Sequence, residues 1–308
     1  MSVLRQVLRD YVSMRRGLGY KFVHQEHQLE GFVTFMDQQN AAVITTKLAL
    51  EWATQPPGRH ASWAIRLSDV RGFARYLHSL EPRTQIPPTG IITYRRRPRP
   101  YIYTEVEIQT LLAAALALPP VHGLRRWTYH CLFGLLAVTG LRISETLALR
   151  CEDVDLKTGI LTIHGSKFGK SRLVPLHRST QQVLLDYARR RDAHLVVPVS
   201  PYFLVAERGG RLLTQYVYPV FWQLSKQTGL RGATAHSGPR LHDFRHSFAV
   251  ATLLNWYRSG QSVDALMPVL STYLGHSCSR YTYWYLSACP ELMDHAARRL
   301  EKRWEALP

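Results

Sequence analysis

The second half of the chain carries side chains of every type that the cleavage of a phosphodiester requires. The phosphorus centre under attack gathers negative charge on its non-bridging oxygens, and a guanidinium offers those oxygens a rigid fork of donors that keeps its proton. A lysine can protonate the leaving alkoxide, and a histidine can donate to the same oxygens. A phenol, with an ordinary pKa of about 10, becomes a nucleophile where positive charge lowers that pKa. The residues of these types are Arg142, Lys167, His242, Arg245, His276 and Tyr285.

Each of these groups also has a plain structural explanation. Arg142 with Glu145 fits a surface ion pair, and the lysines fit an ordinary solvated turn. His242 and Arg245 stand three residues apart on one helical face, which fits a hydrogen-bonded structural pair. The aromatic run over residues 281–285 is typical of core packing. For each residue taken singly, the structural explanation is the better one. The six residues together, however, match what the cleavage of a phosphodiester requires.

The stretches around these residues resemble the sequence boxes of the tyrosine recombinase/integrase family. TGLRISETLAL looks like the first arginine box, SKFGKSRLVPL like the catalytic-lysine hairpin, and LHDFRHSFA like the His-x-x-Arg box. LGHSCSRYTYWY resembles the last box, in which the nucleophile stands nine residues after the histidine. This spacing selects Tyr285 over Tyr273, Tyr281 and Tyr283. The resemblance covers residues 101 to about 300.

The resemblance implies an enzyme that cleaves and rejoins DNA strands at specific sites. Tyr285 would attack a phosphate to form a 3′-phosphotyrosyl link, Lys167 would protonate the leaving 5′-oxygen, and the transition state would be stabilised by Arg142, Arg245, His242 and His276. Because the covalent link retains the bond energy, no cofactor is expected. No carboxylate cluster for two-metal chemistry stands in the sequence, so the reaction is expected to be metal-independent.

The resemblance also implies partners. Double-stranded DNA is the expected substrate, with two protomers on each crossover site and a homotetramer in the synaptic complex. The run YWYLSACPELM is similar to recombinases of transposable elements that carry several recombinase genes side by side, so sister recombinases are expected as further partners.

Charge and composition agree with a DNA-binding protein. The chain has 39 Lys and Arg against 22 Asp and Glu, a formal charge of +17 that would attract polyanions. No apolar run approaches the roughly 18 residues of a membrane span, so no membrane partner is expected. The 4 cysteines form no CxxC pair and are expected to be free buried thiols of a reducing cytoplasm. We therefore expect a bacterial cytoplasmic protein associated with the nucleoid.

Residues 1–90 are predicted to form a helical core-binding, DNA-binding domain. Apolar side chains recur there at helical spacing, and four short amphipathic helices can bury a bundle core without any strand. The apolar stripes consist of Leu4, Val7, Leu8 and Tyr11; Leu29, Phe32, Val33 and Met36; Leu48 and Trp52; and Trp63, Leu67, Val70, Ala74 and Leu77.

Residues 91–102 are predicted to be a basic linker. Prolines stiffen this stretch, and a chain of positive charge in a basic protein is well placed to follow a phosphate backbone, although a merely solvated linker is the alternative. The predicted DNA-binding residues of the linker are Arg95, Arg96, Arg97 and Arg99.

Residues 103–308 are predicted to be the catalytic domain with a C-terminal tail helix. Thr104 and Glu107 form a capping-box pattern, and residues 160–176 read as a hairpin whose Lys170 and Arg172 are further predicted DNA contacts. The long stretch between the two histidine boxes is expected to add or extend a helix. The tail, ELMDHAARRLEKRW, is expected either to dock on a neighbouring protomer or to pack on its own chain. The predicted fold class is mainly α with a small β-hairpin or sheet: a helical bundle plus an α+β catalytic domain.

Two other functions fit part of this pattern. A type IB topoisomerase would use nearly the same constellation but would rejoin the same strand, and the separate helical domain and the tail favour recombination over it. A non-catalytic DNA-binding accessory protein should have lost at least one catalytic group, and none is missing from the sequence.

Overall fold

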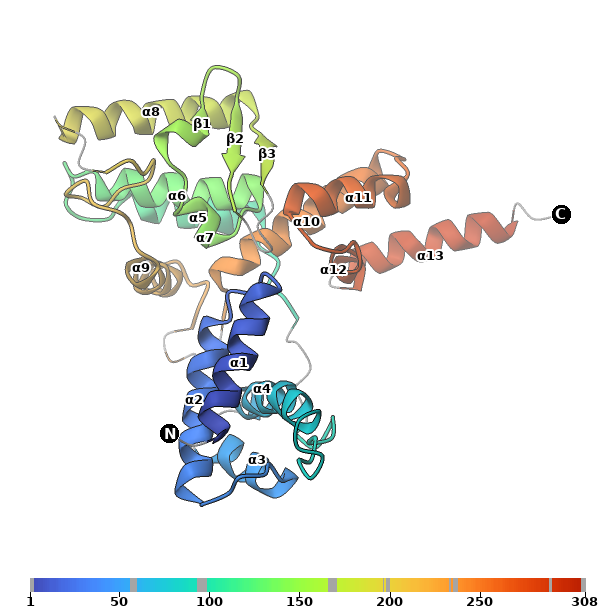
Figure 1. Ribbon diagram of the computed structural model, residues 1–308. Coiled ribbons are helices and arrows are strands. Elements are labelled where there is room, and N and C mark those ends of the chain that lie inside the picture. The colour runs from blue at the N-terminus through green and yellow to red at the C-terminus, as the bar shows by residue number, and fades with distance from the viewer. Residues whose placement is uncertain are drawn as a thin grey trace. The chain divides into compact units, whose positions relative to one another are not determined.

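The computed structural model describes residues 3–55, 60–92, 99–165, 171–195, 197, 200–232, 234, 238–287 and 290–305. The chain divides into two compact units, Met1–Pro98 and Arg99–Pro308 (Figure 1). The predicted fold class is confirmed: helices predominate, and the strands form one small antiparallel sheet.

The first unit is a helical bundle. Its helices are α1 (Val3–Gly17), α2 (Val23–Gln38), α3 (Thr46–Thr54) and α4 (His60–His78). The predicted apolar stripes supply the core, in which Leu29, Phe32 and Val33 have no exposed surface.

The segment after α4 returns to this bundle. The backbone N–H of Gln85 donates to the carbonyl of Ile44 at 2.8 Å, and the Arg71 guanidinium donates to the carbonyls of Pro87 and Pro88. Ile92 packs against the same core. The start of the expected linker, residues 91–92, therefore lies against the first unit.

The second unit holds the other elements. These are α5 (Glu105–Leu116), α6 (Arg125–Thr139), α7 (Ile143–Thr146), η1 (Cys151–Asp153), β1 (Val154–Asp155), β2 (Ile160–Ile163), β3 (Arg172–Pro175), α8 (Arg178–Leu195), α9 (Thr214–Gln227), α10 (Leu241–Arg258), α11 (Val263–Leu274), α12 (Arg280–Tyr283), η3 (Trp284–Ser287) and α13 (Pro290–Glu305). The capping box that begins α5 forms as predicted, between Thr104 and Glu107.

The sheet confirms the predicted hairpin and adds one strand to it. Strands β2 and β3 pair antiparallel, with Ile160 opposite Pro175 and Ile163 opposite Arg172. The buried side chains of this hairpin join the core that α6 forms. Strand β1, which pairs with β2, has only two residues, too few to show the alternation from which a strand is predicted.

Helices α10 and α11 account for the long stretch between the histidine boxes. Helix α10 continues to Arg258 and α11 covers Val263–Leu274, so most of this stretch is helical. Helix α11 ends at Leu274 and is capped by Gly275. The φ of Gly275, 65°, suits a residue without a side chain and lets the N–H of His276 reach back to the carbonyl of Ser271 at 2.9 Å. This turn sets the direction in which the chain leaves towards α12.

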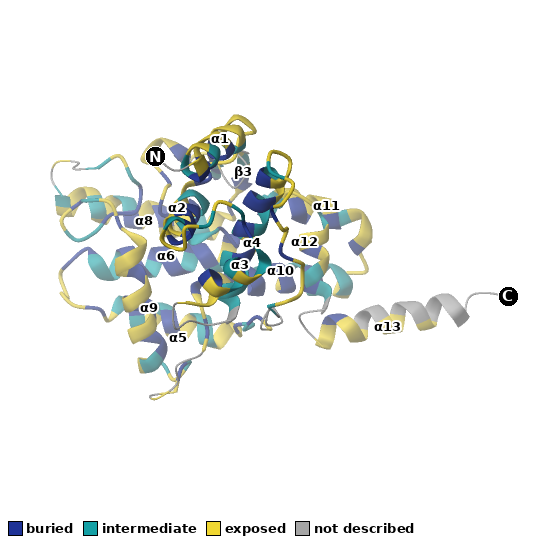
Figure 2. Cartoon of the chain, turned by 60° about the horizontal axis from the view of Figure 1, so that its bottom comes forward, coloured by how far each residue is buried: buried dark blue, intermediate teal, exposed yellow. Residues whose placement is uncertain are grey.

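The tail is helical, as expected, and it begins against its own chain. Leu292 of α13 is fully buried in the cluster that contains Tyr285, and Glu291 pairs with Arg258 of α10 at 2.5 Å. Farther along, the residues of α13 that are coloured in Figure 2 are exposed.

Two other expectations concern membrane-spanning helices and the burial of the cysteines. In the described part of the chain no helix is long and apolar enough to cross a membrane. Cys131 is buried as predicted, but Cys151 and Cys278 are exposed, so the prediction of buried thiols is wrong for these two.

Candidate active site

Arg142 stands at the start of α7, where the chain leaves α6. Its backbone N–H donates to Oε2 of Glu145 at 3.0 Å and its Nη1 donates to Oε1 at 2.7 Å. Its Nη2 donates to the carbonyl of Gly275 at 3.2 Å. The Arg142–Glu145 pair thus exists, but the Glu145 side chain is only 6% exposed, so it is part of an interior network and not a surface pair.

Arg245 lies almost fully buried on α10, with 2% of its surface exposed. Nη1 donates to the carbonyl of Gly140, which caps the C-terminus of α6, at 2.9 Å, and Nη2 donates to the carbonyl of Leu274, the last residue of α11. The last carbonyls of a helix lack partners within it and carry the negative end of its dipole. Two helix ends therefore hold this buried cation through direct hydrogen bonds.

The Arg245 guanidinium stays charged at neutral pH. Burial, and next the charge of Arg142, lower its pKa to about 10. The site thus keeps two cationic forks within one polar network at the pH of the cell.

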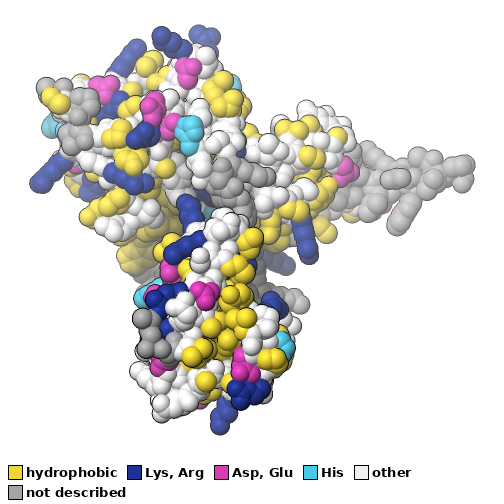
Figure 3. Space-filling view, viewed as in Figure 1, with side chains coloured by type: hydrophobic (Ala, Val, Ile, Leu, Met, Phe, Trp, Pro, Cys, Tyr) yellow, Lys and Arg dark blue, Asp and Glu magenta, His cyan; other side chains and the backbone are white. Residues whose placement is uncertain are grey.

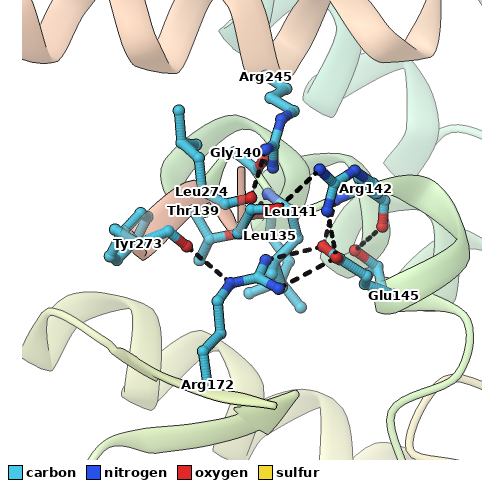
Figure 4. A network of polar contacts seen from close by, with 12 residues as sticks. Leu135, Thr139, Gly140, Leu141, Arg142, Glu145, Arg172, Arg245, Tyr273 and Leu274 are labelled. Atoms are coloured by element: carbon cyan, nitrogen blue, oxygen red, sulfur yellow. Dashed lines mark hydrogen bonds and ion pairs between the residues drawn. The ribbon is translucent and has the colours of Figure 1, made fainter. Parts of the chain in front are cut away.

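Glu145 is the anion at the centre of this network (Figure 4). It accepts from Arg142 and also from Arg172, whose Nη1 and Nη2 reach its two oxygens at 3.1 and 2.9 Å. Burial by itself would raise the pKa of the Glu145 carboxyl, but the hydrogen bonds and charges of the two arginines outweigh burial and hold that pKa at about 2. Glu145 is therefore ionised at neutral pH.

Arg172 engages all three of its guanidinium nitrogens in contacts inside the protein. Its side chain is only 8% exposed. It bonds Glu145 and also the carbonyl of Tyr273, the latter at 2.7 Å. The prediction of a direct DNA contact at Arg172 needs correction for this reason: the donors that would meet a phosphate are directed inward (Figure 4).

Tyr285 lies beside His276. It is 2% exposed in η3, and its ring stacks on that of His276 with centroids 6.1 Å apart and an interplanar angle of 22°. Nδ1 of His276 lies 2.7 Å from the Thr282 hydroxyl. Burial, and next the positive charges of Arg245 and Arg142, lower the pKa of His276 to about 3. His276 is therefore a neutral hydrogen-bonding group at neutral pH.

His242 joins the site through a second histidine. His242 is exposed at the start of α10, and its ring centroid lies 4.7 Å from that of His246, one turn further on. The buried His246 lies 5.5 Å from the ring of Tyr285. Sequence reasoning missed His246, although its position four residues after His242 placed it on the same helical face.

The predicted lysines lie outside the described residues, as do Arg95, Arg96 and Arg97. Among the described residues next to the two lysines, Nε2 of His164 lies 3.0 Å from the buried carboxylate of Asp153, and the N–H of Gly165 donates to the Ser171 hydroxyl at 3.4 Å. Arg99 is exposed. The structure thus brings Arg142, Arg245, His276 and Tyr285 together and places His242 at their edge. Within the described residues, no cluster of His, Cys, Asp and Glu could hold a metal ion.

Replacing Glu145 by glutamine is expected to lower the free energy of unfolding by about 3–5 kcal/mol, because a buried ion pair that loses one partner leaves uncompensated charge. Urea denaturation measures this loss. The matched control is Glu291→Gln, which removes a pair whose side chains are 46% and 61% exposed and should cost at most about 1 kcal/mol. Equal losses in the two variants would contradict a central role for Glu145.

The neutral state of His276 predicts a pH effect on stability. Its pKa in the folded protein is about 3, below the ordinary 6.5, so between these values the unfolded chain takes up a proton that the folded one does not. The contribution of His276 to stability is therefore complete above pH 6.5 and falls as the pH drops below it. Urea unfolding of wild type and His276→Gln at pH 7.5 and 5 should show the stability difference shift against the wild type at the lower pH. A pH-independent difference would contradict this.

Comparisons with known proteins give a family match and a similar curated protein. The model of the phage integrase family matches residues 102–291. The integrase/recombinase y4rB of Sinorhizobium fredii (strain NBRC 101917 / NGR234) is 50% identical over 311 residues, which cover 99% of each chain.

Two solved structures are similar in fold. The Tn1549 transposon integrase in complex with transposon right end DNA gives a TM-score of 0.65 at 15% identity, over 96% of this chain and 99% of that one. A lambda integrase dimer bound to a COC′ core site gives 0.63 at 18% identity, over 91% and 96% of the respective chains. At these identities the similarity is evidence of fold alone.

Proposed function

This chain belongs to the phage integrase family, and on that premise we propose that it is a site-specific DNA recombinase that acts through a covalent 3′-phosphotyrosyl intermediate at Tyr285. The observation that carries the proposal is a convergence. Arg142 and Arg245 both bond the backbone that leads into His276, and the ring of His276 stacks on that of Tyr285.

In the proposed reaction the phenolic oxygen of Tyr285 loses its proton to solvent and attacks the scissile phosphorus. A bond forms between that oxygen and phosphorus, the bond from phosphorus to the 5′-oxygen breaks, and Lys167 gives the departing oxygen its proton. Arg142 and Arg245 meet the charge that grows on the non-bridging oxygens, with His242 and His276 as hydrogen-bond donors. A 5′-hydroxyl of a second strand then attacks the link and releases the tyrosine. No step consumes a cofactor or needs a metal ion.

The neutrality of His276 limits its part in this scheme. With a pKa of about 3, the imidazole donates a hydrogen bond through one ring nitrogen and adds no net charge at neutral pH. The positive charge that offsets the phosphate thus comes from the arginines, and Glu145 offsets part of it.

The proposed substrate is double-stranded DNA. The net charge of +17 supports this, and Figure 3 shows Lys and Arg side chains on the faces of both units. We assign backbone contacts to Arg95, Arg96, Arg97, Arg99 and Lys170, and the core-binding role to the first unit. We further propose a dimer on each site, a tetramer on paired sites with sister recombinases as partners, and action in the bacterial cytoplasm on nucleoid DNA.

The proposal is tested with nicked suicide DNA that carries the ends of the gene's own element. Wild-type protein should form a denaturation-resistant band, and peptide mapping should place the adduct on Tyr285. Tight binding without such a band would instead support an accessory DNA-binding protein. Relaxation of a one-site plasmid without exchange between two sites would support a topoisomerase.

The general acid is tested by replacing the lysines of the hairpin turn. Lys167→Ala should slow cleavage of ordinary DNA, and its rate should recover on DNA whose scissile 5′-bridging oxygen is sulfur, since a thiolate leaves without a proton. Lys170→Ala is the matched control and should gain no more from sulfur than the wild type does. Recovery of Lys170→Ala in place of Lys167→Ala would move the role to Lys170.

A further inference from the structure

We propose that Arg172 is a positioning residue that holds the two proposed phosphate-binding arginines, Arg142 and Arg245, in place. The inference rests on the proposed function and adds to it a residue that touches neither the phosphate nor the reacting tyrosine.

The first support is a set of three consecutive carbonyls at the end of α11. The carbonyl of Tyr273 accepts from Nε of Arg172 at 2.7 Å, that of Leu274 from Arg245, and that of Gly275 from Arg142 at 3.2 Å (Figure 4). These groups lie where a helix leaves its carbonyls unpaired and its dipole negative. The end of one helix therefore orients three guanidiniums, and Arg172 is one of them.

The second support is the double contact with Glu145. The two terminal nitrogens of Arg172 meet the two carboxylate oxygens, and the same oxygens fix Arg142 through its backbone N–H and its Nη1. Arg172 thus shares the anion with Arg142 and sets the place of the carboxylate. Without Arg172, Glu145 would bond Arg142 alone and would be free to pull it away from the phosphate.

The third support is the way in which the donors are used. Arg172 places Nε on one segment and both terminal nitrogens on another, and its side chain is only 8% exposed. A lysine ammonium is a single point and cannot bridge a carbonyl and both oxygens of a carboxylate. The contact is also close, because a Cβ on Gly275 would lie 2.9 Å from Nη1 of Arg172. The site therefore requires the fork and not just the charge.

The experiment compares Arg172→Lys with wild type in single-turnover formation of the covalent complex on three DNAs. One carries the natural phosphate, one a methylphosphonate in which a charged oxygen is a methyl group, and one a 5′-bridging sulfur. On the natural phosphate the variant should be about a hundredfold slower at saturating protein, the effect of an ångström-scale misplacement, with unchanged DNA affinity. The defect should shrink on the methylphosphonate, which has less charge to stabilise, and should persist on the sulfur substrate.

A defect of one size on all three DNAs would overturn the proposal, because Arg172 would then act only through the fold. Recovery on sulfur alone would overturn it as well, since Arg172 would then serve the leaving group. If Arg172→Lys folds poorly, Arg172→Gln is used, and the ratio of rates on two DNAs within one variant does not depend on the folded fraction. Arg190→Lys, an exposed arginine of α8, is the matched control. A wild-type protein that forms no covalent complex on any DNA would reveal the separate failure of the proposed function and would overturn this inference with it.

Discussion

Replacing Tyr285 by phenylalanine is expected to abolish formation of the covalent protein–DNA complex while binding of the same DNA persists. The substitution removes one oxygen, the proposed nucleophile. The ring that remains can keep its stacking on His276 and its contacts with His246 and Trp284. A gel shift and a denaturing gel on the same samples measure the two properties side by side.

The chain provides matched controls for this result. Tyr281 and Tyr283 lie in the same aromatic run and are 58% and 43% exposed, so Tyr281→Phe and Tyr283→Phe should each give the wild-type yield of complex. A band that survives in Tyr285→Phe but disappears in one of these variants would show that the other tyrosine is the nucleophile. The spacing of nine residues from His276 would then be the wrong criterion. Loss of DNA binding in Tyr285→Phe would instead mean that the hydroxyl supports the fold.

Local sequence patterns predicted the elements of this fold well. The apolar stripes of the first unit, the hairpin and the helical tail depend on periodicity and turn residues that lie close together in the chain. Strand β1 escaped prediction because its two residues gain their conformation from pairing with β2. Local patterns thus fail where an element exists only through its partner.

The difference between local patterns and long-range packing also explains which features of the site could be predicted. The spacing of His276 and Tyr285 lies within one short segment and could be read directly, whereas the inward direction of Arg172 could not. In sequence Arg172 looks like the basic residues of the turn that precede it. Its direction depends on the pairing of its backbone with Ile163 and on the approach of α11, whose Tyr273 is distant in the chain. The central place of Glu145 depends on the same long-range packing.

Replacing Arg245 by lysine is expected to slow formation of the covalent complex by about 10²- to 10³-fold, the usual effect of losing a donor placed for transition-state charge. Nη1 and Nη2 each give a hydrogen to a helix end, one to Gly140 and one to Leu274, so the fork still has donors left for a phosphate. A single ammonium cannot meet both carbonyls and the phosphate at once. Single-turnover rates at saturating protein measure the effect, and DNA affinity should change little.

Arg258→Lys is the matched control, because Arg258 ends the same helix and is 61% exposed. The ion pair that the structure gives it is with Glu291, at the start of the tail. Its rate should equal that of the wild type. A lysine at position 245 that sustained the wild-type rate would show that charge alone suffices there, and it would remove the geometric reason for burying a guanidinium between two helix ends. Since the pKa of Arg245 is about 10, the wild-type guanidinium is protonated throughout such an assay at neutral pH, and its titration cannot produce the difference.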